Sequence, residues 1–345
     1  MGVCCPILRP WDRTRDSYLL SIPCLSDPVK RSSLLMKLGL VAIHLVFIGF
    51  LFVCDADFID KTKRDPWYTA SYLLLFSLTL LQYFVTSGSS PGYVIDAMRE
   101  VCGNDAIYRN APTTSIQHGS RKNGSFVINV EGESASGGGG SSRKTPTSSW
   151  AKMVLDLYPP GTSLRNLTCG YCHVEQPPRA KHCHDCDRCV LQFDHHCVWL
   201  GTCVGQKNHC KFWWYICEES ALCIWTLIMY IDYLSNVAKP WWKNAIIILL
   251  LAVLVISMIF VLLLLLFHSY LILTNQSTYE LVRRKRIPYM RNIPERVHPF
   301  SRGIKRNLHN VCCGNDTLDS LPTAFELEDK ARPYTCLDML KCRCC

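Results

Sequence analysis

The chain has 345 residues, with 37 basic and 28 acidic side chains and 21 cysteines. This length could hold two or three soluble domains, but the apolar residues gather in a few long runs, which indicates a membrane protein. The net charge of +9 favours anionic lipid headgroups or phosphorylated ligands, and we expect no nucleic-acid partner. The first residues lack an apolar core and a small-residue cleavage site, so we expect no signal peptide.

Four apolar runs are predicted to cross the bilayer as helices. In chain order they are residues 38–54, 67–86, 213–231 and 245–267. The third run is the most polar, because Glu218 and Glu219 lie in its first two turns. We expect these carboxylates to reach the interface, with a role in a chain-binding cavity as the alternative. His44, in the first run, is expected to be a packed or hydrogen-bonded side chain and not a metal ligand.

The distribution of basic residues decides between three and four spans. Residues 9–37 hold six Lys or Arg and residues 86–212 hold thirteen, whereas the connections 55–66 and 232–244 hold three and two. Four spans place both termini and the long loop in the cytosol, which follows the positive-inside rule. Three spans would put the two ends on opposite sides, against that pattern.

A cluster of cysteines and histidines lies in the loop between the second and third runs. CxxC spacings in a cytosolic segment are typical of zinc sites, because each turn delivers two thiolates to one tetrahedral ion. The segment has few aliphatic side chains, so bound zinc would be structural and would supply most of its folding free energy. Two four-ligand sites need eight ligands, and the candidates are Cys169, Cys172, His182, Cys183, Cys186, Cys189, His196 and Cys203.

Cys197 and His195 are left over by this count. The adjacent imidazole lowers the cost of forming the Cys197 thiolate, and Asp194 can hold the imidazole tautomer. Nucleophile, base and orienting carboxylate follow the logic of a Cys/His/Asp triad. From the spacing alone, Cys197 could equally be a fourth zinc ligand with His196 idle.

These residues resemble the DHHC-type, cysteine-rich-domain family of protein S-acyltransferases (palmitoyltransferases), and most of all its plant members. The match is close over residues 169–212, which include Asp-His-His-Cys at 194–197. The resemblance covers residues 34–314 apart from the insert described below. Three elements outside the loop are similar to family motifs: Ser89–Gly92 to Asp-Pro-Gly, Ser277–Glu280 to Thr-Thr-x-Glu, and His298–Asn307 to the C-terminal motif.

The resemblance implies a role for each residue of the central motif. Cys197 would accept the acyl group, His195 would be the base, Asp194 would orient it, and His196 would bind zinc. The implied zinc sets are Cys169, Cys172, His182 and Cys189 for one ion, and Cys183, Cys186, His196 and Cys203 for the other.

The co-substrate implied is a long-chain acyl-CoA such as palmitoyl-CoA, whose phosphates need cations. We predict Arg179 and Lys181 as contacts, with Lys207 and the basic cluster 283–286 as further candidates. Basic residues after a span also mark the cytosolic side, which is the simpler explanation of that cluster. Trp199 is predicted either to pack on the acyl chain or to anchor at the interface.

The sequence departs from the family pattern without losing a ligand or a triad residue. Val198 stands where the family has Pro, Ser90 stands for the acidic residue of Asp-Pro-Gly, and Ser277 stands for a Thr. Gly201 and Thr202 replace an Asn pair. A commonly basic position is Gln176, which leaves one expected phosphate contact without a cation.

We therefore predict an α-helical, four-helix polytopic membrane protein with a cytosolic two-zinc cysteine-rich domain between the second and third spans. Its predicted function is transfer of a long-chain acyl group from acyl-CoA to Cys197 and then to cysteine-containing, membrane-associated proteins. The alternative is a membrane-anchored zinc-binding adaptor without catalysis. We expect an endomembrane location, in the Golgi or the vacuolar membrane, with the plasma membrane as the alternative.

The predicted segments follow from these assignments. Residues 103–147, rich in Ser, Gly and Thr without an apolar period, are predicted to be a flexible insert. The segments are 1–36 (cytosolic), 37–86 (two spans), 87–168 (cytosolic loop), 169–212 (cysteine-rich domain), 213–273 (two spans) and 274–345 (basic cytosolic tail).

Overall fold

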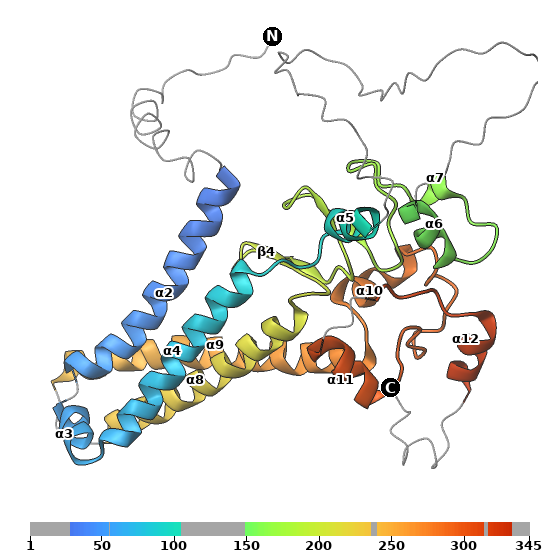
Figure 1. The fold of residues 1–345 in the computed structure, drawn as a ribbon. Helices are drawn as coiled ribbons and strands as arrows, with labels where there is room; N and C mark the ends of the chain where they lie inside the picture. Colours follow the sequence, from blue (N-terminus) through green and yellow to red (C-terminus); the bar gives the residue numbers. More distant parts are fainter. Residues whose placement is uncertain (1–27, 55, 105–148, 236–239, 314–316, 333–345) are drawn as a thin grey trace, which may run out of the picture.

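The computed structural model describes residues 28–54, 56–104, 149–235, 240–313 and 317–332. This part of the chain is a bundle of long helices with a cysteine-rich domain and short helices gathered at one end (Figure 1). The predicted insert lies almost entirely outside these residues. The long helices are α2 (Pro28–Cys54), α4 (Pro66–Gly88), α8 (His209–Ser235) and α9 (Trp241–Thr274), and the short α3 (Ala56–Arg64) joins α2 to α4.

Three of the long helices have the length and apolar composition needed to cross a membrane. The crossing segments are Arg31–Val53 in α2, Pro66–Gly88 in α4 and Trp241–Thr274 in α9. They contain the first, second and fourth predicted runs, so the chain is an integral membrane protein. The third run lies in α8, which has 27 residues but is more polar because of its acidic pair. It packs against α4 and α9.

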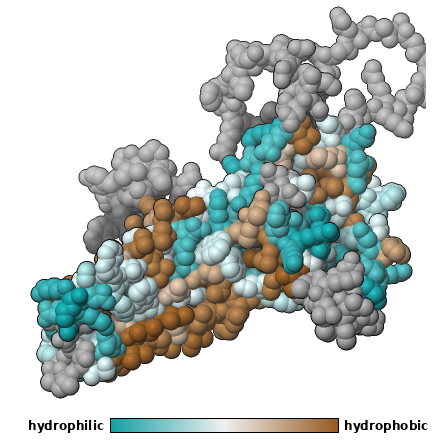
Figure 2. Space-filling view, turned by 60° about the horizontal axis from the view of Figure 1, so that its bottom comes forward, coloured by the Kyte–Doolittle hydropathy of each residue, from teal (hydrophilic) through white to brown (hydrophobic). Residues whose placement is uncertain are grey.

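The outer surface of the bundle is apolar. On α9, Leu249, Leu263 and Leu266 are 65%, 61% and 67% exposed. Figure 2 shows a hydrophobic band along the bundle, between the hydrophilic α3 end and the hydrophilic surface of the cysteine-rich end. A helix that is apolar on all sides suits contact with lipid, which explains why these residues stay helical while exposed.

Hydroxyl groups connect the helices inside the bundle. The hydroxyls of Tyr72 on α4 and Thr226 on α8 are 2.9 Å apart, and Tyr230 on α8 donates to the carbonyl of Phe47 on α2 at 2.8 Å. Both tyrosines are buried. Because an unpaired hydroxyl in hydrocarbon is costly, these bonds help to fix α8 against α4 and α2.

The cysteine-rich domain is built on two short hairpins. Strand β1 (Lys181–Cys183) pairs antiparallel with β2 (Arg188–Val190), and β3 (His195–Cys197) pairs antiparallel with β4 (Thr202–Val204). After β4, a Cβ built on Gly205 would lie 2.7 Å from the Pro91 carbonyl oxygen, so the backbone passes directly over the turn that follows α4. The accompanying helices are α5 (Val94–Asn104), α6 (Ser149–Asp156) and α7 (Leu164–Leu167).

The chain after α9 folds back onto this domain. Asn275 ends α9 in the left-handed conformation, with φ 49°. Ser277 and Glu280 then form a capping box that starts α10, in which each side chain bonds the other residue's backbone N–H. The remaining elements are α10 (Thr278–Arg283), the 3-10 helix η2 (Arg284–Arg286), α11 (Ile304–Cys312) and α12 (Ala324–Ala331).

Candidate active site

Two groups of four thiol and imidazole donors form in the cysteine-rich domain. Within each group the donor atoms lie within 4.8 Å of one another. The groups contain the same residues as the two predicted zinc sets. They are Cys169, Cys172, His182 and Cys189, and Cys183, Cys186, His196 and Cys203.

The spacing of the donors fits a zinc ion. A tetrahedral Zn²⁺ with Zn–S bonds of about 2.3 Å and Zn–N bonds of about 2.0 Å separates its ligand atoms by about 3.5 to 3.8 Å. In the second group, His196 Nδ1 lies 3.7 Å from Cys183 Sγ, 3.4 Å from Cys186 Sγ and 3.6 Å from Cys203 Sγ. Thiols and imidazoles at these distances are the donors that zinc prefers.

The β3–β4 hairpin separates the metal donor from the reactive pair. Successive side chains of a strand point to opposite faces, so His196 faces one side while His195 and Cys197 share the other. His196 is paired with Cys203 across the hairpin, and both belong to the second donor group. Cys197 belongs to neither group. The alternative in which Cys197 is the ligand and His196 is idle does not fit this arrangement.

Asp194, His195 and Cys197 lie together, with Asp194 hydrogen-bonded to His195 and with His195 and Cys197 on one face of β3. His195 Nδ1 lies 2.6 Å from Asp194 Oδ2, and the His195 side chain lines the same cavity as the Cys197 thiol. Asp194 is buried. Thr278 donates to it twice, from its backbone N–H to Oδ1 at 2.6 Å and from its hydroxyl to Oδ2 at 2.8 Å. The first turn of α10 therefore holds the carboxylate that orients the imidazole.

Hydrogen bonds outweigh burial in setting the charges of these three groups. Burial alone would raise the pKa of the Cys197 thiol, but bonds from His195 and from the N–H groups of Leu200 and Trp199 lower it. Burial would lower the pKa of His195, but its bonds to Asp194 and Cys197 raise it to about 9. The pKa of the Asp194 carboxyl is lowered despite burial, chiefly by the bond from His195. The site thus favours a thiolate beside an imidazolium, the nucleophilic form of cysteine.

Cys197 opens onto a cavity of about 620 Å³ that extends into the helical bundle. Trp199 and Phe212 line the end near the thiol, whereas Tyr72 and Thr226 line the opposite part. Thr226 follows Phe212 by 14 residues on α8, which corresponds to about 21 Å along a helix. The lining side chains come from α2, α4, α8, α9 and the β3–β4 hairpin, and most are apolar. The cavity has the form expected for a long, flexible apolar ligand attached at the thiol.

One polar pair interrupts the apolar wall of the cavity. Both carboxylate oxygens of Glu219 lie 3.1 Å from His44 Nε2, and both residues line the cavity. His44 Nδ1 donates to the Leu40 carbonyl at 2.9 Å, so the Nε2 contact requires either a second ring proton or a protonated carboxyl. The expectation of a hydrogen-bonded His44 is confirmed. For Glu219 the structure agrees with the placement in the alternative expectation, since its carboxylate contacts His44 of α2 and lines the cavity.

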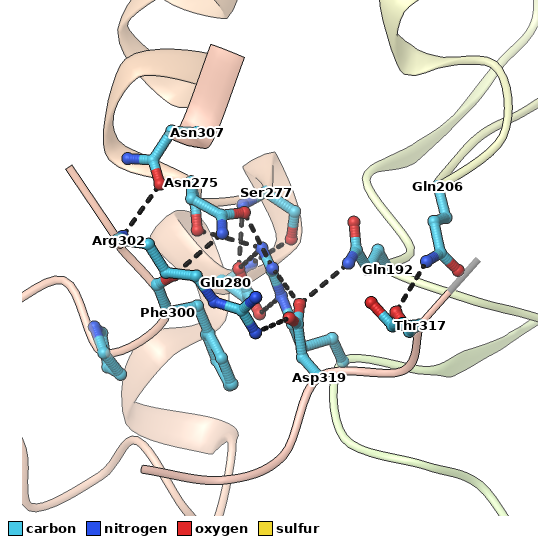
Figure 3. Close-up of polar contacts among 12 residues, drawn as sticks. Gln192, Gln206, Asn275, Ser277, Glu280, Phe300, Arg302, Asn307, Thr317 and Asp319 are labelled. Atoms are coloured by element: carbon cyan, nitrogen blue, oxygen red, sulfur yellow. Dashed lines mark hydrogen bonds and ion pairs between the residues drawn. The ribbon is translucent and has the colours of Figure 1, made fainter. Parts of the chain in front are cut away.

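Arg179 lies in a buried polar network. Its five N–H donors are all occupied, two by the Glu280 carboxylate, one by Asp319, and two by the side-chain and backbone oxygens of Asn275. Glu280, Asn275 and Asp319 converge in this network in Figure 3. The guanidinium also lies 4.5 Å from the centroid of the Phe300 ring. Arginine has no further donor, so the expected contact with a CoA phosphate does not fit this geometry.

The other expected acyl-CoA contacts lie at the surface of the site. Lys181 is partly exposed, and its Nζ lies 5.5 Å from the centroid of the Tyr279 ring. Trp199 is 48% exposed at the mouth of the cavity, and its backbone carbonyl accepts a bond from the Tyr83 hydroxyl at 2.7 Å. Within the basic cluster 283–286, Arg284 is buried and donates to two backbone carbonyls. The cluster is therefore not a uniform surface of free cations.

Comparisons with known proteins decide the family. Residues 163–285 match the family DHHC palmitoyltransferase. Over 345 residues the chain is 81% identical to Protein S-acyltransferase 10 of Arabidopsis thaliana, and the match covers 100% of both chains. The chain belongs to the DHHC palmitoyltransferase family and is a protein S-acyltransferase.

More distant relatives of this DHHC acyltransferase match a smaller part of it. It is 38% identical over 162 residues to human Palmitoyltransferase ZDHHC12, covering 46% of this chain and 59% of the relative. It is also 38% identical over 152 residues to Putative ZDHHC-type palmitoyltransferase 7 of Dictyostelium discoideum, covering 43% and 35%.

The sequence reasoning missed two residues of this DHHC acyltransferase, one beside the triad and one in the buried network of Arg179. His268 of α9 has a donor atom within 4.8 Å of those of Asp194 and His195, and its Nδ1 lies 3.3 Å from His209 Nε2. A histidine at the end of an apolar span was the available signal. Asp319, which binds Arg179, lies beyond the range that resembles the family, and no pattern in the sequence pointed to it.

Proposed function

We propose that Cys197 carries the acyl group between acyl-CoA and a protein thiol, with His195 as the base and Asp194 orienting it. In the first step, Cys197 Sγ attacks the thioester carbonyl carbon, the bond from that carbon to the CoA sulfur breaks, and the CoA thiolate takes a proton from His195. In the second step, a substrate cysteine gives its proton to His195 and attacks the new thioester, which frees Cys197. The observation that carries this proposal is the Cys197 thiol at the end of an apolar cavity, beside a histidine that is hydrogen-bonded to a buried carboxylate.

The acyl chain of palmitoyl-CoA would occupy the cavity, with its thioester at Cys197. Each buried methylene contributes about 0.8 kcal/mol, so a chain that fills the apolar lining is favoured over a short one. Trp199 would pack on the chain at the cavity mouth. Lys181 would contact a CoA phosphate, whereas we propose a structural role for Arg179 because its donors are occupied.

The two donor groups would hold two structural zinc ions. The residues concerned are Cys169, Cys172, His182 and Cys189, and Cys183, Cys186, His196 and Cys203. Bound zinc would supply folding free energy to a domain with a small core and would fix the hairpin that carries His195 and Cys197. Four protein ligands per ion are typical of structural sites, so the reaction steps are assigned to the side chains alone.

We also propose that α8 crosses the membrane as a fourth span, with both termini and the cysteine-rich domain in the cytosol. Its length, its packing against α4 and α9 and the basic loops support this topology. The His44–Glu219 contact supports it too, because the polar pair faces the bundle interior and not lipid. The substrates would be cysteine-containing proteins at the cytosolic face of an endomembrane, in the Golgi or the vacuole.

Labelling with an alkyne fatty acid tests the role of Cys197. The wild-type protein and the control variant Cys217→Ala should both carry a hydroxylamine-sensitive label, and Cys197→Ala should carry none. Cys217 is a suitable control because it lies on α8 outside the cavity lining. Equal labelling of Cys197→Ala would show that another thiol accepts the acyl group. The chain is 81% identical over its full length to an S-acyltransferase. This similarity favours the acyltransferase over the alternative of a non-catalytic zinc adaptor.

A further inference from the structure

The C-terminal segment Thr317–Leu321 crosses the cysteine-rich domain. Gln206, which follows β4, donates its side-chain N–H to the Thr317 carbonyl at 3.3 Å (Figure 3). The Leu321 backbone N–H donates to the Leu157 carbonyl at 2.9 Å. The segment is therefore held on both sides of Asp319, by the cysteine-rich domain at Thr317 and by the residue that follows α6 at Leu321. It lies outside the residues that match the family, which end at position 285.

The carboxylate of Asp319 joins the tail to three other parts of the chain. Its Oδ2 accepts bonds from Arg179 Nη1 and Gln192 Nε2, both at 2.8 Å, and its Oδ1 accepts from Arg302 Nη2 at 3.3 Å. Gln192 and Arg302 approach Asp319 from opposite sides in Figure 3. The Asp319 side chain is 9% exposed and that of Arg179 is 3% exposed. A buried carboxylate with this many charged and polar donors is a built part of the fold.

A continuous path of hydrogen bonds leads from Arg179 to the triad. Arg179 Nε and Nη2 bind the two oxygens of Glu280 at 2.8 and 3.0 Å. The same carboxylate accepts from the Ser277 N–H at 2.9 Å and so shapes the first turn of α10. The next residue, Thr278, holds both oxygens of Asp194. The Arg179–Glu280 and Thr278–Asp194 links each consist of two hydrogen bonds, so the path connects the tail to the triad through few residues.

Asp319 supplies a second charged acceptor for the Arg179 guanidinium, in addition to Glu280. Arg179 has φ 67°, a backbone conformation that a side chain other than glycine rarely adopts without support. Glu280 holds one edge of the guanidinium, and Asp319 is the charged acceptor for Nη1. Glu280 and Asp319 balance the charge of the buried Arg179, and Asp319 also pairs with Arg302, whose side chain is 46% exposed. Without the Asp319 charge the guanidinium would be free to shift, and Glu280 would shift with it.

We propose that Asp319 is a positioning residue of the acyltransferase. It holds Arg179, and through Glu280 and Thr278 it fixes the Asp194 carboxylate that orients His195. The C-terminal tail would thereby act on the rate of acyl-enzyme formation without touching the substrate. This inference rests on the proposed roles of Asp194, His195 and Cys197.

The test is single-turnover acylation of the purified full-length protein with palmitoyl-CoA. Asp319→Asn should lower the maximal rate of acyl-enzyme formation about 10-fold, with the half-saturating palmitoyl-CoA concentration unchanged, as is typical when a supporting partner is lost. Asp319→Glu, which restores the charge, should recover most of the rate. The matched control is Asp329→Asn, because Asp329 lies on the same tail and forms an exposed pair with Arg332. It should behave as wild type.

The outcomes separate this inference from the proposed function. A wild-type rate in Asp319→Asn, or a rate in Asp319→Glu no higher than in Asp319→Asn, would overturn the positioning role while Cys197→Ala stays inactive. An acyl-enzyme in Cys197→Ala would overturn the proposed function instead. If Asp319→Asn loses its zinc, Gln192→Asn takes its place, since Asn tolerates the backbone φ of 43° at Gln192. The rate of acyl-enzyme formation in Gln192→Asn should fall about 3-fold, as expected for the loss of one hydrogen bond. A wild-type rate in this variant would overturn the inference.

Discussion

The polar pair inside the cavity gives a prediction that distinguishes an effect on stability from an effect on acyl transfer. His44 on α2 and Glu219 on α8 lie 3.1 Å apart, with side chains 9% and 13% exposed. Replacing either residue by leucine leaves the other polar group buried in an apolar wall. Replacing both removes the polar groups together and extends the apolar lining. The variants His44→Leu, Glu219→Leu and the double variant therefore form a complete cycle.

The magnitudes follow from the cost of an unpaired buried charge. Breaking a buried pair by removing one partner costs about 3 to 5 kcal/mol, whereas replacing both by apolar residues is often neutral or stabilising. Since a small part of each side chain is exposed, we take the lower end, about 3 kcal/mol, for each single variant. The double variant should be more stable than either single one, because the two losses are coupled through the contact.

The assay is thermal unfolding of the purified protein in detergent, followed by tryptophan fluorescence, together with transfer of palmitate to a protein thiol. Both single variants should melt at lower temperature, and the double variant should recover most of that loss. The folded double variant should still transfer palmitate, because neither residue contacts the reacting atoms. Additive losses in the double variant would refute the reasoning, since they would show that the two side chains contribute independently.

Three further variants test the metal sites, the triad and the backbone contact. Cys183→Ala should release zinc and misfold, whereas Cys197→Ala should keep both ions by metal analysis of the purified protein, and equal loss would make Cys197 a ligand. Thr278→Val removes the hydroxyl donor to the triad carboxylate but keeps the backbone donor; the rate of acyl-enzyme formation should fall about 3-fold in single turnover, and an unchanged rate would contradict the role of the hydroxyl. Gly205→Ala places a Cβ 2.7 Å from two neighbouring atoms and should cost about 1 to 3 kcal/mol by overpacking, lowering the melting temperature relative to Gly88→Ala, where no atom lies within 4 Å. Equal melting temperatures would contradict the close approach.

The long apolar runs could be predicted because their signal is local. Residues 38–54, 67–86 and 245–267 contain no charged residue, and apart from Cys54 each run lies in a candidate span. The environment of Glu219 could not be predicted in the same way. Its partner His44 lies 175 residues earlier, and a single sequence gives no information on which two polar groups of an apolar bundle meet.

The same limit applies to the environment of Arg179. A cation beside a zinc-binding loop is a reasonable phosphate contact when only the loop is considered. Its acceptors come from Asn275, Glu280 and Asp319, which are 96, 101 and 140 residues further along the chain. That Arg179 is buried, with all its N–H donors occupied, is therefore a property of the tertiary structure. Nothing in the local sequence distinguishes this arginine from an exposed one.

A ligand count and a family motif separate the candidate zinc ligands from the candidate triad in the sequence, and the hairpin gives a physical reason for that separation. In a strand, residues two apart share a face, so His195 and Cys197 meet while His196 turns to the metal group. On a helix, residues two apart lie about 200° apart, and the pair would point in different directions. A slip of β3 by one residue against β4 would exchange the faces, sending Cys197 to the metal side and His196 to the cavity. The pairing of His196 with Cys203, two donors for one ion, opposes that slip, so metal binding would protect the register on which the nucleophile depends.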